Sequence, residues 1–193
     1  MHRSVAYLLL ISAAIVLVSG QWLVRSVAQN CQSIPYKVES TTINCYNTGK
    51  VYQRIECDAY NASYYECTSS DCTTGCTLAV RRELNTCDAF AHTYHCYPNS
   101  QPDYAHYVGN HYIQANYYLR DKCQGKPFQV LAYPTSCRYI GPYLSYNWLC
   151  PNGTATEEVY GDGKCEYDPS STKWGADGAC GYDSLYYYEM ICT

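Results

Sequence analysis

The sequence predicts an all-β protein of two tandem, small, antiparallel β modules that are sandwich-like and stapled by disulfide bonds. Three observations lead to this prediction: a six-cysteine spacing that occurs twice, a hydrophobic period of two residues, and fourteen cysteines in 193 residues. Such a cysteine density is typical of exported domains in which cross-links replace part of the apolar core.

Residues 1–20 have the features of a signal peptide, with a short basic start and an apolar run from Val5 to Val18. The run is too short to cross a bilayer and fits a signal-peptide core; an uncleaved anchor is the alternative. Small residues favour cleavage after Gly20 or after Ala28, and both stay open. We expect a secreted, extracellular protein without a membrane partner once the signal is removed.

The cysteine repeat defines the modules. Successive separations are 14, 12, 15, 15 and 9 residues in the first copy, and 14, 13, 15, 15 and 12 in the second. The match predicts one module at 31–96 and another at 123–193. Their shared cysteines are Cys31, Cys45, Cys57, Cys72, Cys87 and Cys96, then Cys123, Cys137, Cys150, Cys165, Cys180 and Cys192.

Two further cysteines, Cys67 and Cys76, make the first module an eight-cysteine unit. The second module has Tyr160 and Pro169 at the aligned positions, so both cysteines are missing together. We therefore predict a Cys67–Cys76 bond and three bonds inside each module. The pairing within a module stays open, because six cysteines allow fifteen connectivities.

Glycosylation triplets begin at Asn61 and Asn152, shortly after the third cysteine of each module. In an exported chain such triplets indicate surface loops that carry N-linked glycans.

Alternating side chains predict strands over 51–56 and 186–191, and residues 78–84 are the one stretch suited to a short helix. The connecting segment 97–122 is rich in tyrosine and free of cysteine. We expect at least one strand there, packed on the second module. Residues 21–30 are apolar and form a lead strand, which pairs either within its own chain or with a neighbouring chain.

The sequence contains no catalytic or phosphate-binding motif, and every cysteine is expected in a disulfide. We therefore expect no enzyme activity, no catalytic residue, no cofactor and no metal site. The net charge of −4 and the lack of a basic cluster argue against nucleic acid as a partner.

Tyrosine is the commonest ring, with 24 copies, and not all of them fit inside small modules. Exposed rings suit protein interfaces and sugar rings. The candidates are Trp22, Tyr104, Tyr107, Tyr112, Tyr117, Tyr118, Tyr143, Tyr146, Trp148, Tyr186, Tyr187 and Tyr188.

The second module contains the stretch CPNGTATEEVYGDGKC, with Tyr-x-Asp just ahead of a cysteine, and the first has a weaker version, YYECTSSDC. In these features the chain resembles Tyr-rich, Cys-rich tandem-module secreted proteins of protists, including subunits of extracellular glycosylated fibrils. The resemblance covers the modules only. It implies a polymer or coat subunit and carries no catalytic residue.

Two functions follow as expectations. The first is a secreted, glycosylated structural protein that assembles with copies of itself into an extracellular filament, coat or matrix. The alternative is an extracellular carbohydrate-binding, lectin-like module with a polysaccharide partner.

Overall fold

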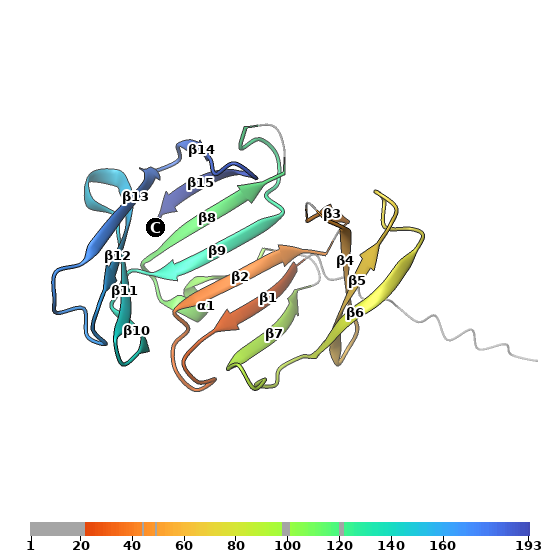
Figure 1. Ribbon diagram of the computed structural model, residues 1–193, viewed down its shortest axis with the longest axis horizontal. Coiled ribbons are helices and arrows are strands. Elements are labelled where there is room, and N and C mark those ends of the chain that lie inside the picture. Colours follow the sequence, from red (N-terminus) through yellow and green to blue (C-terminus); the bar gives the residue numbers. More distant parts are fainter. Residues whose placement is uncertain (1–21, 44, 49, 98–100, 120–121) are drawn as a thin grey trace, which may run out of the picture.

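The computed structural model describes residues 22–43, 45–48, 50–97, 101–119 and 122–193. The predicted signal peptide lies outside the described residues. The described chain is almost entirely β structure, as predicted, and it forms three antiparallel sheets (Figure 1).

The largest sheet has seven strands in the order β14-β15-β8-β9-β2-β1-β7. A four-stranded sheet, β3-β4-β5-β6, covers one end of it, and another, β10-β11-β12-β13, covers the other end (Figure 1). In the order of the large sheet, its strands are Cys180–Tyr182, Tyr187–Cys192, Tyr112–Tyr118, Gln129–Pro134, Lys37–Thr42, Trp22–Val27 and His92–Tyr97. The strands β3 to β6 are Tyr46–Asn47, Tyr52–Cys57, Asn61–Cys67 and Cys76–Glu83, and β10 to β13 are Arg138–Gly141, Leu144–Leu149, Thr154–Tyr160 and Ser170–Ala176.

Each small sheet packs on the half of the large sheet that belongs to its own module. In the first module, β1 to β7, Leu23 of β1 packs with Ile55 of β4. In the second, β8 to β15, Ile113 of β8 packs with Trp148 of β11. Each module is therefore a small β sandwich with its own core.

The disulfide map repeats between modules. The first cysteine bonds the fifth, the second the fourth and the third the sixth in both copies. Cys67 bonds Cys76, the pair predicted from the sequence, and no free cysteine remains. No bond joins the two modules, so they are linked covalently only by the connecting segment.

The modules meet where β2 pairs with β9, which makes the large sheet continuous. The first cysteines of the two copies are 123 − 31 = 92 residues apart, so Glu39 and Leu131 are equivalent positions. These two residues lie opposite each other, with Val38 opposite Ala132 and Ser40 opposite Val130. The pairing is therefore pseudo-symmetric, with a two-fold axis at Glu39 and Leu131.

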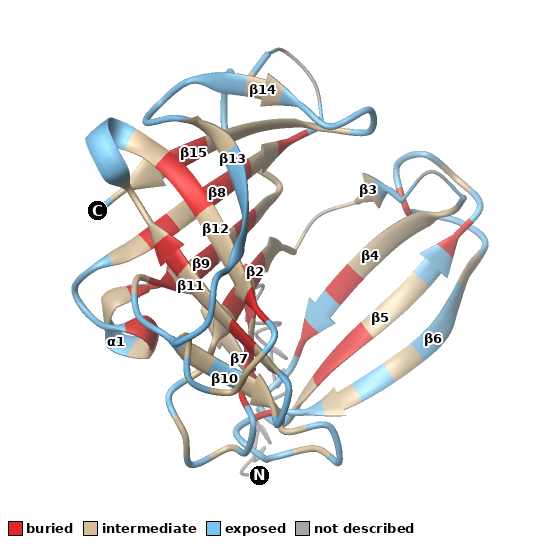
Figure 2. Ribbon diagram, turned by 60° about the vertical axis from the view of Figure 1, so that its left-hand side comes forward, coloured by how far each residue is buried: buried red, intermediate tan, exposed pale blue. Residues whose placement is uncertain are grey.

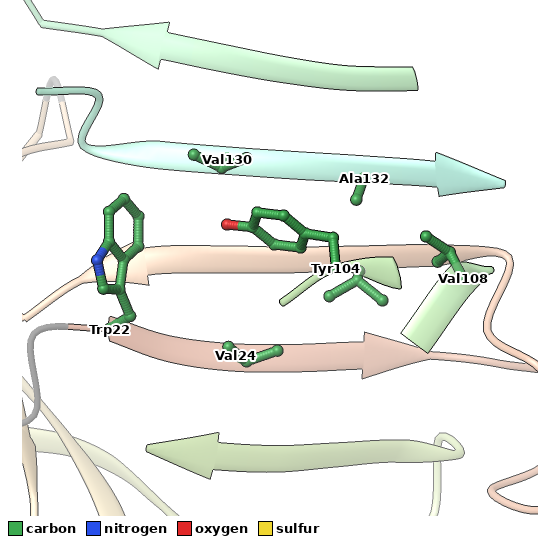
Figure 3. Packing of buried hydrophobic residues seen from close by; sticks show 7 residues of the cluster. Trp22, Val24, Tyr104, Val108, Val130 and Ala132 are labelled. Carbon is green, nitrogen blue, oxygen red and sulfur yellow. The ribbon is translucent and has the colours of Figure 1, made fainter. Parts of the chain in front are cut away.

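The connecting segment covers this junction on the face away from the small sheets. A single helical turn, α1 (Ala105–Val108), places Tyr104 and Val108 against Trp22 and Val24 of β1, in a cluster that also holds Val38, Val130 and Ala132 (Figure 3). The hydroxyl groups of Tyr104 and Ser40 hydrogen-bond. The junction therefore has an apolar core drawn from both modules.

The lead strand predicted within residues 21–30 corresponds to β1, which lies between β2 and β7 of the same chain. Of the two alternatives, the structure shows pairing within the same chain. Cleavage of the signal peptide after Ala28 would remove this strand. The predicted strands at 51–56, at 186–191 and in the connecting segment are confirmed as β4, β15 and β8.

The prediction of a short helix over 78–84 was wrong. These residues belong to β6 and to the buried Leu84 that follows it. Leu, Ala, Arg and Glu favour a helix locally, but the ladder to β5, fixed at one end by the Cys67–Cys76 bond, overrides that preference. A second short helical turn, η1 (Pro151–Gly153), joins β11 to β12.

Candidate ligand cleft between the modules

A cleft of about 800 Å³ lies between the two modules, and we call it the inter-module cleft. The first module contributes β3, the turn after it, the start of β4 and Ser70 in the loop between β5 and β6. The second contributes the end of β8 and the loops before β9 and β15. The lining residues are Cys45, Tyr46, Asn47, Thr48, Tyr52, Ser70, Tyr118, Leu119, Gln124, Gly125, Lys126, Phe128, Leu185 and Tyr186.

Three rings form a row across the module boundary. The ring centroids of Tyr46 and Phe128 are 6.0 Å apart, and those of Phe128 and Tyr186 are 5.0 Å apart. All three rings are half-buried, so each keeps some exposed surface in the cleft. We call these residues the ring row.

Local backbone contacts fix the ring row. Phe128 donates its N–H to Tyr117 in its own module, and its carbonyl accepts from Thr42 in the other, at 2.9 Å in both cases. Before Tyr186, the Asp183 carboxylate accepts the N–H of Leu185 at 3.0 Å and that of Tyr186 at 2.8 Å. Aspartate stabilises such turns because its side chain replaces a backbone acceptor.

Burial and the neighbouring Tyr186 raise the pKa of the Tyr46 phenol to about 12. Tyr46 therefore stays uncharged at physiological pH and donates its hydroxyl proton to the amide oxygen of Gln53. Near the ring row, the cleft is lined by amides, hydroxyls and one ammonium group, while its described lining contains no carboxylate. Flat apolar faces beside such hydrogen-bonding groups suit a ligand that is apolar on one side and hydroxylated at its rim.

A smaller cavity of about 180 Å³ lies beside the cleft, and we call it the side pocket. Its lining is Leu23, Arg25, Glu39, Thr41, Tyr64 and Gln129. The two cavities are neighbours, since Gln129 follows Phe128 in the chain and Tyr64 packs in the same cluster as Tyr46.

The side pocket contains an ion cluster. Glu39 contacts Arg25 through one carboxylate oxygen and Lys37 through the other, the latter at 2.6 Å. Burial alone would raise the pKa of Glu39, but the two cations together outweigh it and lower that pKa. Glu39 therefore stays ionised, although its side chain is only 13% exposed.

The structure places the predicted ring candidates in several environments. Trp22, Tyr104, Tyr118 and Trp148 are buried, so the expectation that they offer an exposed binding surface is wrong. Most of them fill core positions beside aliphatic residues such as Val24 and Ile113. Tyr143 is the most exposed candidate, and the half-buried ones are Tyr107, Tyr112, Tyr117, Tyr146, Tyr186, Tyr187 and Tyr188.

Only Tyr118 and Tyr186 of these candidates line the cleft, and the buried Tyr118 directs its hydroxyl to Glu189 at 3.0 Å. Sequence reasoning missed Tyr46, Tyr52 and Phe128. A signal for Phe128 existed, because both cysteine repeats carry proline and then a ring, at Tyr36 and Phe128.

The glycosylation triplets occupy matching connections. Asn61 begins β5 after the β4–β5 turn, and Asn152 lies in η1 between β11 and β12. Neither residue lines the cleft.

The outer strands of the small sheets, β6 and β13, are largely exposed (Figure 2). Each has a register shift of the kind a β-bulge makes, and each carries cations, Arg81 and Arg82 on β6 and Lys173 on β13. Bulges and charges are features that keep edge strands from pairing with other chains. The edge strands β6 and β13 are therefore poorly suited to pairing with another copy of the chain, which weakens the expectation of self-assembly through these two edges.

The described residues contain no group of three or more His, Cys, Asp or Glu placed to hold a metal ion. Within the same residues, no helix has the length and hydropathy to span a membrane. Comparison with protein-family models, with curated proteins and with solved structures found no match for this chain.

Proposed function

We propose that this chain is an extracellular carbohydrate-binding protein whose inter-module cleft holds a saccharide against the ring row. The observation that carries the proposal is the alignment of Tyr46, Phe128 and Tyr186, drawn from both modules, beside amides and hydroxyls. Sugar rings present apolar C–H faces and a rim of hydroxyls, which match this pairing of surfaces.

The surroundings of the cleft support an extracellular setting. Seven disulfides indicate an oxidising compartment. N-linked glycans at Asn61 and Asn152 would leave the cleft open, because neither asparagine lines it.

The test is binding of the purified chain to immobilised cellulose, chitin, mucin and acidic polysaccharides, followed by titration with oligosaccharides. We expect Phe128→Ala to weaken binding roughly tenfold, which corresponds to about 1.4 kcal/mol. The matched control is Tyr143→Ala, because Tyr143 is 82% exposed and lies outside the cleft. Failure to bind any member of a broad glycan panel would overturn the proposal.

A second candidate function is the self-assembling subunit of an extracellular filament, coat or matrix. The observation that favours it is a set of large exposed side chains on both modules: Tyr60, Phe90, Tyr143, Tyr167 and Leu185. Each of them offers apolar area that contact with a second copy of the chain would bury. Negative-stain imaging of the secreted material tests this candidate, and a monodisperse monomer at high concentration would argue against it.

A further inference from the structure

The two neighbouring cavities differ in charge from the rest of the protein. The chain as a whole has a net charge of −4. By contrast, Lys126 lines the inter-module cleft, Arg25 lines the side pocket, and Lys37 contacts Glu39 there. Glu39 is the single carboxylate in the described lining of both cavities.

Glu39 does not cancel this positive charge. Its two oxygens are already engaged by Arg25 and Lys37. Among the lining residues of the two cavities, Lys126 and Arg25 face Glu39 alone, which leaves a surplus of one positive charge. The Arg25 side chain is 37% exposed, and Glu39 contacts only its Nη2 atom. A guanidinium has five N–H donors, so Arg25 keeps donors for an anionic group in the pocket.

From this charge distribution we infer that the saccharide held by the ring row is acidic, with carboxylate or sulfate groups bound by Lys126 in the inter-module cleft and by Arg25 in the side pocket. The inference rests on the proposed function and specifies its ligand class. The ring row contacts the sugar faces, whereas the cations select the acidic substituent. Arginine suits both carboxylate and sulfate, because its planar fork matches two oxygens of either group.

The experiment is calorimetric titration of the full chain with three oligosaccharides of equal length: one neutral, one carrying uronates and one carrying sulfates. We expect at least one acidic oligosaccharide to bind roughly tenfold more tightly than the neutral one. The advantage should shrink as salt is raised from about 0.05 M to 0.5 M, because salt screens charge pairs at an exposed site. The uronate and sulfate arms identify the acidic group.

The deciding variant is Lys126→Gln, since Lys126 is exposed and its replacement leaves the core intact. We expect this change to remove most of the preference for the acidic oligosaccharide, measured as the ratio of the acidic to the neutral affinity. Lys173→Gln, on the exposed strand β13, is the matched control and should change neither affinity. The double variant Arg25→Gln, Glu39→Gln removes one charge of each sign, so it tests the side pocket at an unchanged net charge, although Lys37 loses its partner Glu39.

Two outcomes would overturn the inference while leaving the proposed function in place. One is equal binding of neutral and acidic oligosaccharides, and the other is an acidic preference that survives Lys126→Gln and the double variant. Loss of both neutral and acidic binding in Phe128→Ala would confirm that the ring row is involved. Absence of binding to all three oligosaccharides and to the wider panel would instead overturn the proposed function.

Discussion

The first module should not fold without β1. A chain that begins at Gln29 lacks Trp22, Leu23, Val24 and Val27, each at most 6% exposed in the full protein. Burying a large apolar side chain stabilises a protein by about 1.5–3 kcal/mol, so the four together contribute about 6–12 kcal/mol. Whole domains are stable by only about 5–15 kcal/mol. Removing β1 therefore eliminates most or all of the stability of this module.

The assay compares two secreted chains, one starting at Gln21 and one at Gln29, each behind the same foreign signal peptide. We expect the shorter chain to be retained inside the cell or to be secreted with free thiols. Without β1 between β2 and β7, Cys57 and Cys96 are no longer held next to each other. Hydrogen exchange should show lost protection in β2 and β7. A synthetic peptide of residues 21–28 should restore part of it.

The second module serves as the internal control, since its core is separate and its exchange protection should largely persist. An unchanged melting temperature, complete disulfides and a protected β7 in the shorter chain would refute the reasoning. N-terminal sequencing of the natural product gives an independent check: processing must leave Trp22 in place.

Three further predictions follow from single contacts. Replacing Cys67 and Cys76 together by serine should cost about 2.6 kcal/mol in the chain-entropy model, less than any other bond here, because the loop spans only nine residues; chemical denaturation measures it. Tyr104→Phe should cost about 1 kcal/mol, since it removes the buried hydrogen bond to Ser40. Because the pKa of Glu39 is lowered in the folded protein, ionised Glu39 adds to the free energy of unfolding above the unfolded-state pKa of about 4.3. This stabilisation is lost as the pH falls through the folded-state pKa. The free energy of unfolding should therefore fall less steeply below that pH in Glu39→Gln than in the parent protein.

The disulfide framework was the feature most open to prediction from sequence. Cysteine spacing is insensitive to which residues fill the core, so the repeat identified two modules and the Cys67–Cys76 bond. Connectivity inside a module was not open to prediction. It depends on which strands lie side by side, and many alternative pairings satisfy the same spacing.

The junction between modules could not be foreseen. The strand β2 has the sequence KVESTT, in which Val and Thr favour a strand, but its single aliphatic side chain does not mark a buried face. Its pairing with β9 joins residues about ninety positions apart, and local propensity contains no information on such contacts. The helical turn that covers the junction was equally hidden, because its four residues are too few for a periodic pattern.

The candidate site shows a different limit of prediction from sequence. Tyrosine suits both a core and a binding surface, so its abundance indicated rings without indicating where they point. The buried Tyr104 and the cleft-lining Tyr186 look alike in sequence. Their roles separate only once the modules are docked, because the cleft is made by residues of both.

The pseudo-symmetric pairing explains why the ring row occurs at one end of the junction. A two-fold axis at Glu39 and Leu131 gives every position at one end an equivalent at the other. Phe128 corresponds to Tyr36, so a ring is kept, but Tyr46 corresponds to Arg138, so the first ring of the row is lost. The equivalent of Glu39 is Leu131, which confines the ion cluster to one side as well. Two modules docked in a symmetric frame have thus diverged at the positions that shape the cleft, which is the pattern expected if one composite site, rather than two, was retained for binding.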